Sequence, residues 1–218
     1  MEQLGLTYSG ERRGGRRVGA GRKRAPAARR HTPHRARAEH RARHPVHVTL
    51  RSSVKSLRSQ HVVRTVLHAL RDSGAQRFRI THYSIQDNHV HLLVEAENKS
   101  ALSTGVRGLM VRVASRVNKL LFRRGRFWAD RWHGHALKSP REVRNALRYV
   151  LQNHRKHAPG AASVDPLSSA QWFDGFATPL PSTFRSVGPQ SIAPPETWLL
   201  RVGWRRHGLL SLAESPKI

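Results

Sequence analysis

One stretch of sequence decides the fold: FRITHYSIQDNHVHLLVE, at residues 78–95. Residues 78–85 alternate between apolar and polar side chains, which predicts a β-strand. An Asp-Asn pair follows and favours a tight turn. Residues 89–95 continue as a second, more apolar strand. The stretch therefore predicts a β-hairpin with two histidines near the start of its second strand.

The segments on either side of this hairpin alternate between strand and helix patterns. Strands are predicted where apolar residues alternate, and helices where they recur at a spacing of three or four. In chain order we expect a strand at residues 46–50, a helix at 59–72, the hairpin, a helix at 101–122 capped by Ser100, a short strand at 135–137, and a helix that begins with the capping box Ser139–Glu142 and ends near residue 157.

This order predicts an α+β sandwich, in which a small antiparallel sheet packs against helices on one side. The predicted domain spans residues 45–157. Residues 1–44 carry 13 Lys and Arg against three acids and few large apolar residues, so we expect a disordered basic tail. Residues 158–218 are rich in Pro, Gly and Ser and predict an irregular C-terminal extension whose tryptophans pack onto the core.

The composition restricts the partners of the chain. It holds 40 Lys and Arg against 13 Asp and Glu, a formal net charge of +27, which favours a polyanion such as nucleic acid. The absence of Cys excludes disulfides, thiolate metal sites and cysteine nucleophiles. No apolar run is long enough for a transmembrane helix, and the N-terminus is too charged for a secretory signal. We therefore expect a cytoplasmic protein without a membrane partner.

His89 and His91 are the candidate metal ligands. Alternate residues of a strand point to the same face, so the two imidazoles should lie side by side, with Val90 facing the other way. Two neighbouring imidazoles can share a divalent cation, and such a cation can act as a Lewis acid on a phosphodiester. The alternative is a pair of strand histidines without a metal role, because the chain holds 15 His.

The context of the pair resembles a known family. Asn88-His89-Val90-His91-Leu92-Leu93 is followed by an amphipathic helix, then by Gly125-Arg126-Phe127-Trp128, a short strand and a capped helix that ends in Tyr149-Val150-Leu151-Gln152-Asn153. This series, over residues 45–157, resembles the single-tyrosine HUH transposases, which are the insertion sequence 200-like proteins and their relatives associated with repetitive extragenic palindromes (REP). The resemblance implies a ferredoxin-like domain that acts on single-stranded or hairpin DNA with Mg²⁺ or Mn²⁺.

The resemblance also implies roles for particular residues. His89 and His91 would bind the metal, and a polar residue on the following helix, here Asn118, would complete the site. The nucleophile would be a tyrosine on that same helix, but residues 111–117 contain none. Ser115 matches only by position. The other tyrosines near the domain, Tyr83 and Tyr149, are expected to be core residues, so strand transfer through tyrosine is doubtful and no covalent adduct is expected.

Basic and aromatic residues around the helix predict contact with DNA whatever the chemistry. Phe127, Trp128 and Trp132 could stack on unpaired bases, although Trp128 fits better as a core residue. The cations expected to contact DNA are Arg112, Arg116, Lys119, Arg123, Arg124, Arg126 and Arg131.

Three functions remain open from the sequence. The first is a transposase-family protein that binds single-stranded or hairpin DNA and cuts it with a metal. The second is a catalytically inactive, domesticated DNA-binding protein on the same fold. The third is a basic RNA-binding or structural protein in which the histidine pair is incidental. A homodimer is compatible with all three.

Overall fold

The computed structural model describes residues 39–156, 164–184 and 192–214. All of these residues belong to one compact unit, Thr32–Ile218. The predicted disordered tail lies outside the described residues up to residue 38. None of the helices among the described residues is long and apolar enough to cross a membrane.

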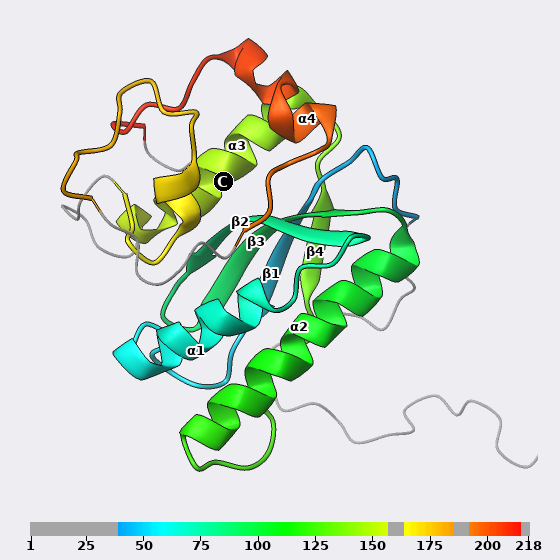
Figure 1. Cartoon of the computed structure of the whole chain (residues 1–218), viewed down its shortest axis with the longest axis vertical. Coiled ribbons are helices and arrows are strands. Elements are labelled where there is room, and N and C mark those ends of the chain that lie inside the picture. The colour runs from blue at the N-terminus through cyan, green and yellow to red at the C-terminus, as the bar shows by residue number, and fades with distance from the viewer. Residues whose placement is uncertain (1–38, 157–163, 185–191, 215–218) are drawn as a thin grey trace, which may run out of the picture. The chain divides into compact units, whose positions relative to one another are not determined.

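A four-stranded antiparallel sheet forms the centre of this unit (Figure 1). Its strands are β1 (Val46–Arg51), β2 (Phe78–Ile85), β3 (His89–Ala96) and β4 (His133–Ala136), in the order β2-β3-β1-β4. The predicted hairpin is formed by β2 and β3. This strand order, with a helix after β1 and another after β3, is the ferredoxin-like arrangement and confirms the α+β prediction.

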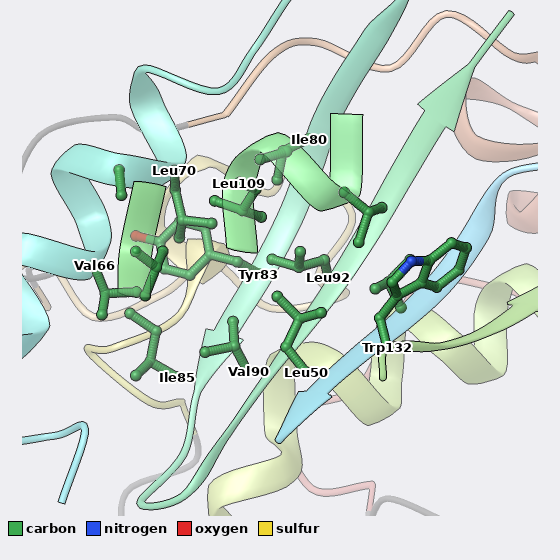
Figure 2. Close-up of a cluster of buried hydrophobic side chains, with 14 of the residues drawn as sticks. Leu50, Val66, Leu70, Ile80, Tyr83, Ile85, Val90, Leu92, Leu109 and Trp132 are labelled. Atoms are coloured by element: carbon green, nitrogen blue, oxygen red, sulfur yellow. The ribbon is translucent and has the colours of Figure 1, made fainter. Parts of the chain in front are cut away.

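Two helices cover one face of the sheet. They are α1 (Gln60–Arg71) and α2 (Lys99–Leu120), and they pack on the buried residues Leu50, Val90 and Leu92. Figure 2 shows these side chains beside Val66 and Leu70 of α1 and Leu109 of α2. The prediction that Ser100 caps the N-terminus of α2 was wrong by two residues.

Asn98 rather than Ser100 caps α2, because the Asn98 side chain accepts a hydrogen bond of 2.9 Å from the amide of Ala101.

The third long helix, α3 (Pro140–Gln152), lies on the opposite face of the sheet (Figure 1). Leu93 of β3 points to that face and joins a separate buried cluster with Leu147 and Val150 of α3. The expectation that all helices lie on one side of the sheet was therefore wrong. The predicted capping box is confirmed: Ser139 and Glu142 bond to each other's backbone and begin α3, which ends at Gln152 and is followed by a short 3-10 turn, Asn153–Lys156.

A β-bulge in β2 decides which way its second half faces. Ile80 pairs with Val94, but His82 pairs with Leu93, so Thr81 is an extra residue in the ladder. The extra residue turns Tyr83 towards α1 and α2, where it is fully buried. Burial raises the pKa of the Tyr83 phenol far above its ordinary value. Tyr83 is thus a core residue, as the sequence predicted.

The described parts of the C-terminal extension pack against α3 and the β2 edge of the sheet. Trp204 is buried against the α3 cluster, which confirms part of the predicted packing, whereas Trp198 stays half exposed. Arg58 holds the extension through a two-pronged ion pair with Asp165, at 2.7 and 2.9 Å. The buried Glu95 carboxylate accepts hydrogen bonds from the backbone amides of residues 196 and 197. The extension is therefore part of the fold.

Glu214 ties the end of the extension to α3 and gives a first testable prediction. Its carboxylate contacts Arg144 at 2.7 and 3.0 Å and Arg148 at 3.0 Å. The Arg144 guanidinium, with help from the Ser211 amide and Arg148, lowers the pKa of Glu214 to about 2. The folded pKa lies below the ordinary value, so this contribution to stability is present above about pH 4.5 and is lost as the pH falls towards 2.

We expect Glu214→Gln to lower the free energy of unfolding at pH 7 by at most about 1 kcal/mol, because the carboxylate is partly exposed. Thermal unfolding at a series of pH values checks this, and the difference from wild type should narrow as the pH falls from about 4.5 towards 2. Glu97→Gln removes an exposed ion pair with Arg77 and serves as the control with no expected shift. A pH-independent difference for Glu214→Gln would contradict the prediction.

Candidate active site

His89 and His91 share one face of β3, as the alternation predicted. Val90 between them is buried on the α1 and α2 side, and the two imidazole ring centroids are 4.7 Å apart. The two rings differ in exposure, because only 3% of the His91 surface is accessible while His89 is partly exposed. The reason is α3, which covers this face.

Hydrogen bonds to Nδ1 orient both rings. His91 Nδ1 lies 3.2 Å from Thr49 Oγ1 and 3.2 Å from His47 Nε2, both of β1. His89 Nδ1 lies 2.8 Å from Asn88 Oδ1. A proton on each Nδ1 would be donated to these groups, and Nε2 would then carry the lone pair, which is the tautomer that binds a metal. The strand register, which pairs Thr49 with His91, creates this arrangement.

His47 is a neutral imidazole at ordinary pH. Burial, followed by the nearby His133 and His135, lowers its pKa to about 4. Its ring centroid is 5.2 Å from that of His91. A neutral His47 can exchange a hydrogen bond with His91 without placing a positive charge beside a prospective metal ligand.

Tyr149 of α3 lies directly beside the histidines. Its ring centroid is 5.0 Å from that of His91 and 5.6 Å from that of His47, and both contacts are edge-on. The side chain is partly exposed, and burial raises the pKa of its phenol. Tyr149 was expected to be a core residue, but it lies at the histidine site. The helix that covers the histidine pair is therefore α3 and not α2.

Asn153 stands one helical turn after Tyr149, at the C-terminal end of α3. β4 runs parallel to β3, because both pair antiparallel with β1, and α3 follows β4 after a short turn. Only 1% of Asn153 is accessible, and neither polar atom of its side chain has a hydrogen-bond partner among the described residues. A buried amide oxygen without a partner is costly unless a ligand satisfies it.

The structure does not bring Asn118 and Ser115 to the histidines. Both belong to α2, which covers the opposite face of the sheet. The Asn118 amide instead donates a hydrogen bond of 3.1 Å to the carbonyl of Gly125 and so holds the loop after α2. The expected set of His89, His91 and Asn118 therefore does not converge.

A metal site at the histidines fits the donor set that is present. Among the described residues, no group of three or more His, Asp and Glu could hold a metal ion. The two imidazoles, whose Nδ1 atoms are held by neighbours, and the amide oxygen of Asn153 at the end of α3 are, however, donor types that suit a divalent cation.

The predicted DNA-binding cations fall into two groups. Arg112 donates a 2.6 Å hydrogen bond to Ser73, and Arg116 forms an ion pair of 2.7 Å with Asp72, so both join α2 to the end of α1. The other group lies at the C-terminal end of α2 and in the segment that follows it, where most of the side chains are exposed: Lys119, Arg123, Arg124, Arg126 and Arg131.

The aromatic residues after this loop are structural. Phe127, Trp128 and Trp132 are all buried, and the Trp128 indole donates a 2.8 Å hydrogen bond to the carbonyl of Met110. The suggestion that they stack on bases was wrong for Phe127 and Trp132, and the interpretation of Trp128 as a core residue is confirmed. The sequence did not single out Phe122, which is the only aromatic residue with a positive φ in the described part of the chain.

Four residues on the histidine face of the sheet or on the helix that covers it were missed from the sequence: His47, Thr49, Arg51 and Asn153. Arg51 is exposed and pairs with His89 across the sheet, so both side chains lie on the same face. The spacing of four residues between Tyr149 and Asn153 was an available signal, because such residues share one face of a helix. No pattern in the sequence indicates the register of β1 against β3, which places His47, Thr49 and Arg51 on the histidine face.

The fold and the arrangement of the histidine pair are characteristic of one class of protein. A ferredoxin-like sheet that carries a His-apolar-His pair beside a tyrosine from a covering helix is the arrangement of the HUH superfamily. A comparison with known families matches residues 43–153 to the family described as "Transposase IS200 like". The chain therefore belongs to the IS200-like transposase family.

The solved structures include one with the same fold, whose title is "Structure of the REP associates tyrosine transposase bound to a REP hairpin". The match has a TM-score of 0.53 and 17% sequence identity, and it covers 63% of this chain and 82% of that one. No curated protein matches the chain.

Proposed function

We propose that this protein is a metal-dependent DNA strand-cleaving enzyme that acts on single-stranded or hairpin DNA, with Tyr149 as its nucleophile. The observation that carries the proposal is the convergence of Tyr149 with His89 and His91 on the α3 face of the sheet. Family membership supports it, and the solved structure with the same fold is of a transposase bound to a DNA hairpin.

His89, His91 and Asn153 would hold a Mg²⁺ or Mn²⁺ ion, which would supply Lewis-acid polarisation of the scissile phosphate. Thr49, His47 and Asn88 keep the two imidazoles in position through their Nδ1 atoms. Arg51, on the same face as His89, can pair with a phosphate oxygen of the bound strand.

In the proposed step, the phenolic oxygen of Tyr149 attacks the scissile phosphorus. A bond forms between that oxygen and phosphorus, the bond from phosphorus to the leaving sugar oxygen breaks, and the leaving oxygen takes up a proton as a free hydroxyl. The phenolic proton passes to solvent water during the attack, and the leaving oxygen takes its proton from solvent; loss of the phenolic proton is demanding because burial raises the pKa of Tyr149. The covalent intermediate would permit rejoining to a second strand.

The alternatives have less support. A DNA-binding protein without catalysis would not need a tyrosine beside oriented histidines. A basic RNA-binding protein with an incidental pair does not account for the buried amide of Asn153, whose polar atoms have no partner in the described structure.

The proposal is tested by incubating the full chain with a labelled DNA hairpin that has a single-stranded tail, in Mn²⁺ or in a chelator. We expect a covalent protein–DNA adduct in Mn²⁺ only, and binding that weakens steeply with salt because of the +27 charge. Salt-independent binding would exclude a phosphate-dominated mode, and binding without an adduct would favour the catalytically inactive alternative. Tighter binding of an RNA hairpin than of DNA would favour the third function.

A further inference from the structure

Phe122 is the most exposed large apolar residue in the described structure, with 99% of its surface accessible. It follows the last turn of α2 and its C-cap, Leu121. Its φ is +48°, a left-handed conformation that disfavours a bulky side chain and that helix ends usually assign to glycine. The position therefore holds a residue that neither burial nor backbone preference explains.

The surroundings of Phe122 are strongly basic. Residues 119–126, which we call the basic loop, contain four cations and no acid: Lys119, Arg123, Arg124 and Arg126. A second copy of this chain docked here would bring two such loops together, which like charges oppose. A polyanion with flat apolar groups is the complementary partner, and single-stranded DNA has both features.

The basic loop is held rigidly at the end of the sheet that carries His89. Asn118 donates to the Gly125 carbonyl, and Ser53 donates to the carbonyls of Arg126 and Phe127 at 3.0 and 2.8 Å. The neighbouring Ser52 amide bonds to the Asn88 carbonyl at 2.8 Å, directly beside His89. A strand that reaches the histidines from this end can therefore also reach the loop.

We propose that the Phe122 ring stacks on an unpaired base of the bound DNA strand, while the cations of the basic loop contact its phosphates. The inference rests on the proposed DNA function and adds a binding site to it. The site lies on the α2 side of the molecule, away from Tyr149. It selects for unpaired bases, because a base within a duplex has both faces stacked already.

The test uses Phe122→Gly, which removes the ring and supplies the residue that the backbone prefers. We expect the Tm to be kept or raised, by up to about 4 °C, because a left-handed position favours glycine. Affinity for a hairpin with a single-stranded tail should fall about 10-fold, whereas affinity for a blunt duplex should not change. The slope of affinity against salt should stay the same, because no phosphate contact is lost.

Two matched variants and a base probe complete the test. Val111→Ala changes another exposed apolar side chain of α2 outside the basic loop and should bind like wild type. Arg124→Ala should lower the salt slope by about 0.7. A tail carrying 2-aminopurine should lose fluorescence at one position on binding to wild type, and this quenching should disappear with Phe122→Gly.

The outcomes separate this inference from the proposed function. If Phe122→Gly binds the tailed hairpin and quenches 2-aminopurine as wild type does, the proposed stacking site is overturned and the proposed DNA function is unaffected. Absence of DNA binding by wild type would remove both. Sedimentation can reveal a role in self-association. If wild type is a dimer, Phe122→Gly is a monomer and the quenching is kept, Phe122 acts in self-association and the inference is overturned.

Discussion

Replacement of Tyr149 by Phe should abolish covalent capture of DNA and reduce strand cleavage at least about 10³-fold. The substitution removes only the phenolic oxygen, and the ring that contacts His91 and His47 at 5.0 and 5.6 Å is kept. The affinity for hairpin DNA should therefore stay near that of wild type. Cleavage of a labelled hairpin in Mn²⁺, with the adduct mapped by mass spectrometry, measures the effect.

Tyr83→Phe is the matched control, because the bulge in β2 places Tyr83 in the core on the other side of the sheet. This variant should cleave like wild type. An adduct that maps to Tyr83, or cleavage by Tyr149→Phe at the wild-type rate, would exclude the proposed nucleophile.

Loss of either histidine of the pair should also reduce cleavage strongly. We expect His89→Ala and His91→Ala each to lower metal-dependent cleavage by more than about 10²-fold, because each removes a prospective ligand of the ion. The affinity for Mn²⁺, measured by electron paramagnetic resonance without DNA, should fall in parallel. Cleavage that survives the double replacement would exclude the metal mechanism.

The two candidates for the third ligand are distinguished by a pair of variants. Asn153→Ala should weaken Mn²⁺ binding by about 10- to 100-fold, since its buried amide oxygen lacks a partner among the described residues. Asn118→Ala, on the far face of the sheet, should leave Mn²⁺ binding unchanged although it loosens the loop at Gly125. The reverse result would restore the metal set that the sequence suggested.

The sequence by itself determined the main strands and helices and the pairing of His89 with His91 on one strand. The hairpin, the capped start of α3 and the common face of His89 and His91 follow from alternation and capping, which are local properties of a few neighbouring residues. The +27 charge likewise follows from composition alone and indicates a polyanionic partner.

The tertiary structure alone decided which helix faces the histidines. The sequence shows that α2 and α3 are amphipathic but not which face of the sheet each covers, because buried apolar residues of β3 lie on both faces. Packing placed α3 over His91 and α2 on the opposite side. Tyr149 thereby lies beside His91, while Ser115 and Asn118 lie on the helix that covers the other face.

A single extra residue in β2 decides which face of the sheet Tyr83 lies on. In a regular ladder that continues from the pair Ile80–Val94, Tyr83 would stand opposite His91 on the histidine face. The bulge at Thr81 shifts the register by one residue and sends the ring into the core. Alternation predicts a strand but cannot reveal a bulge, because a bulge depends on the partner strand and on the packing of both faces.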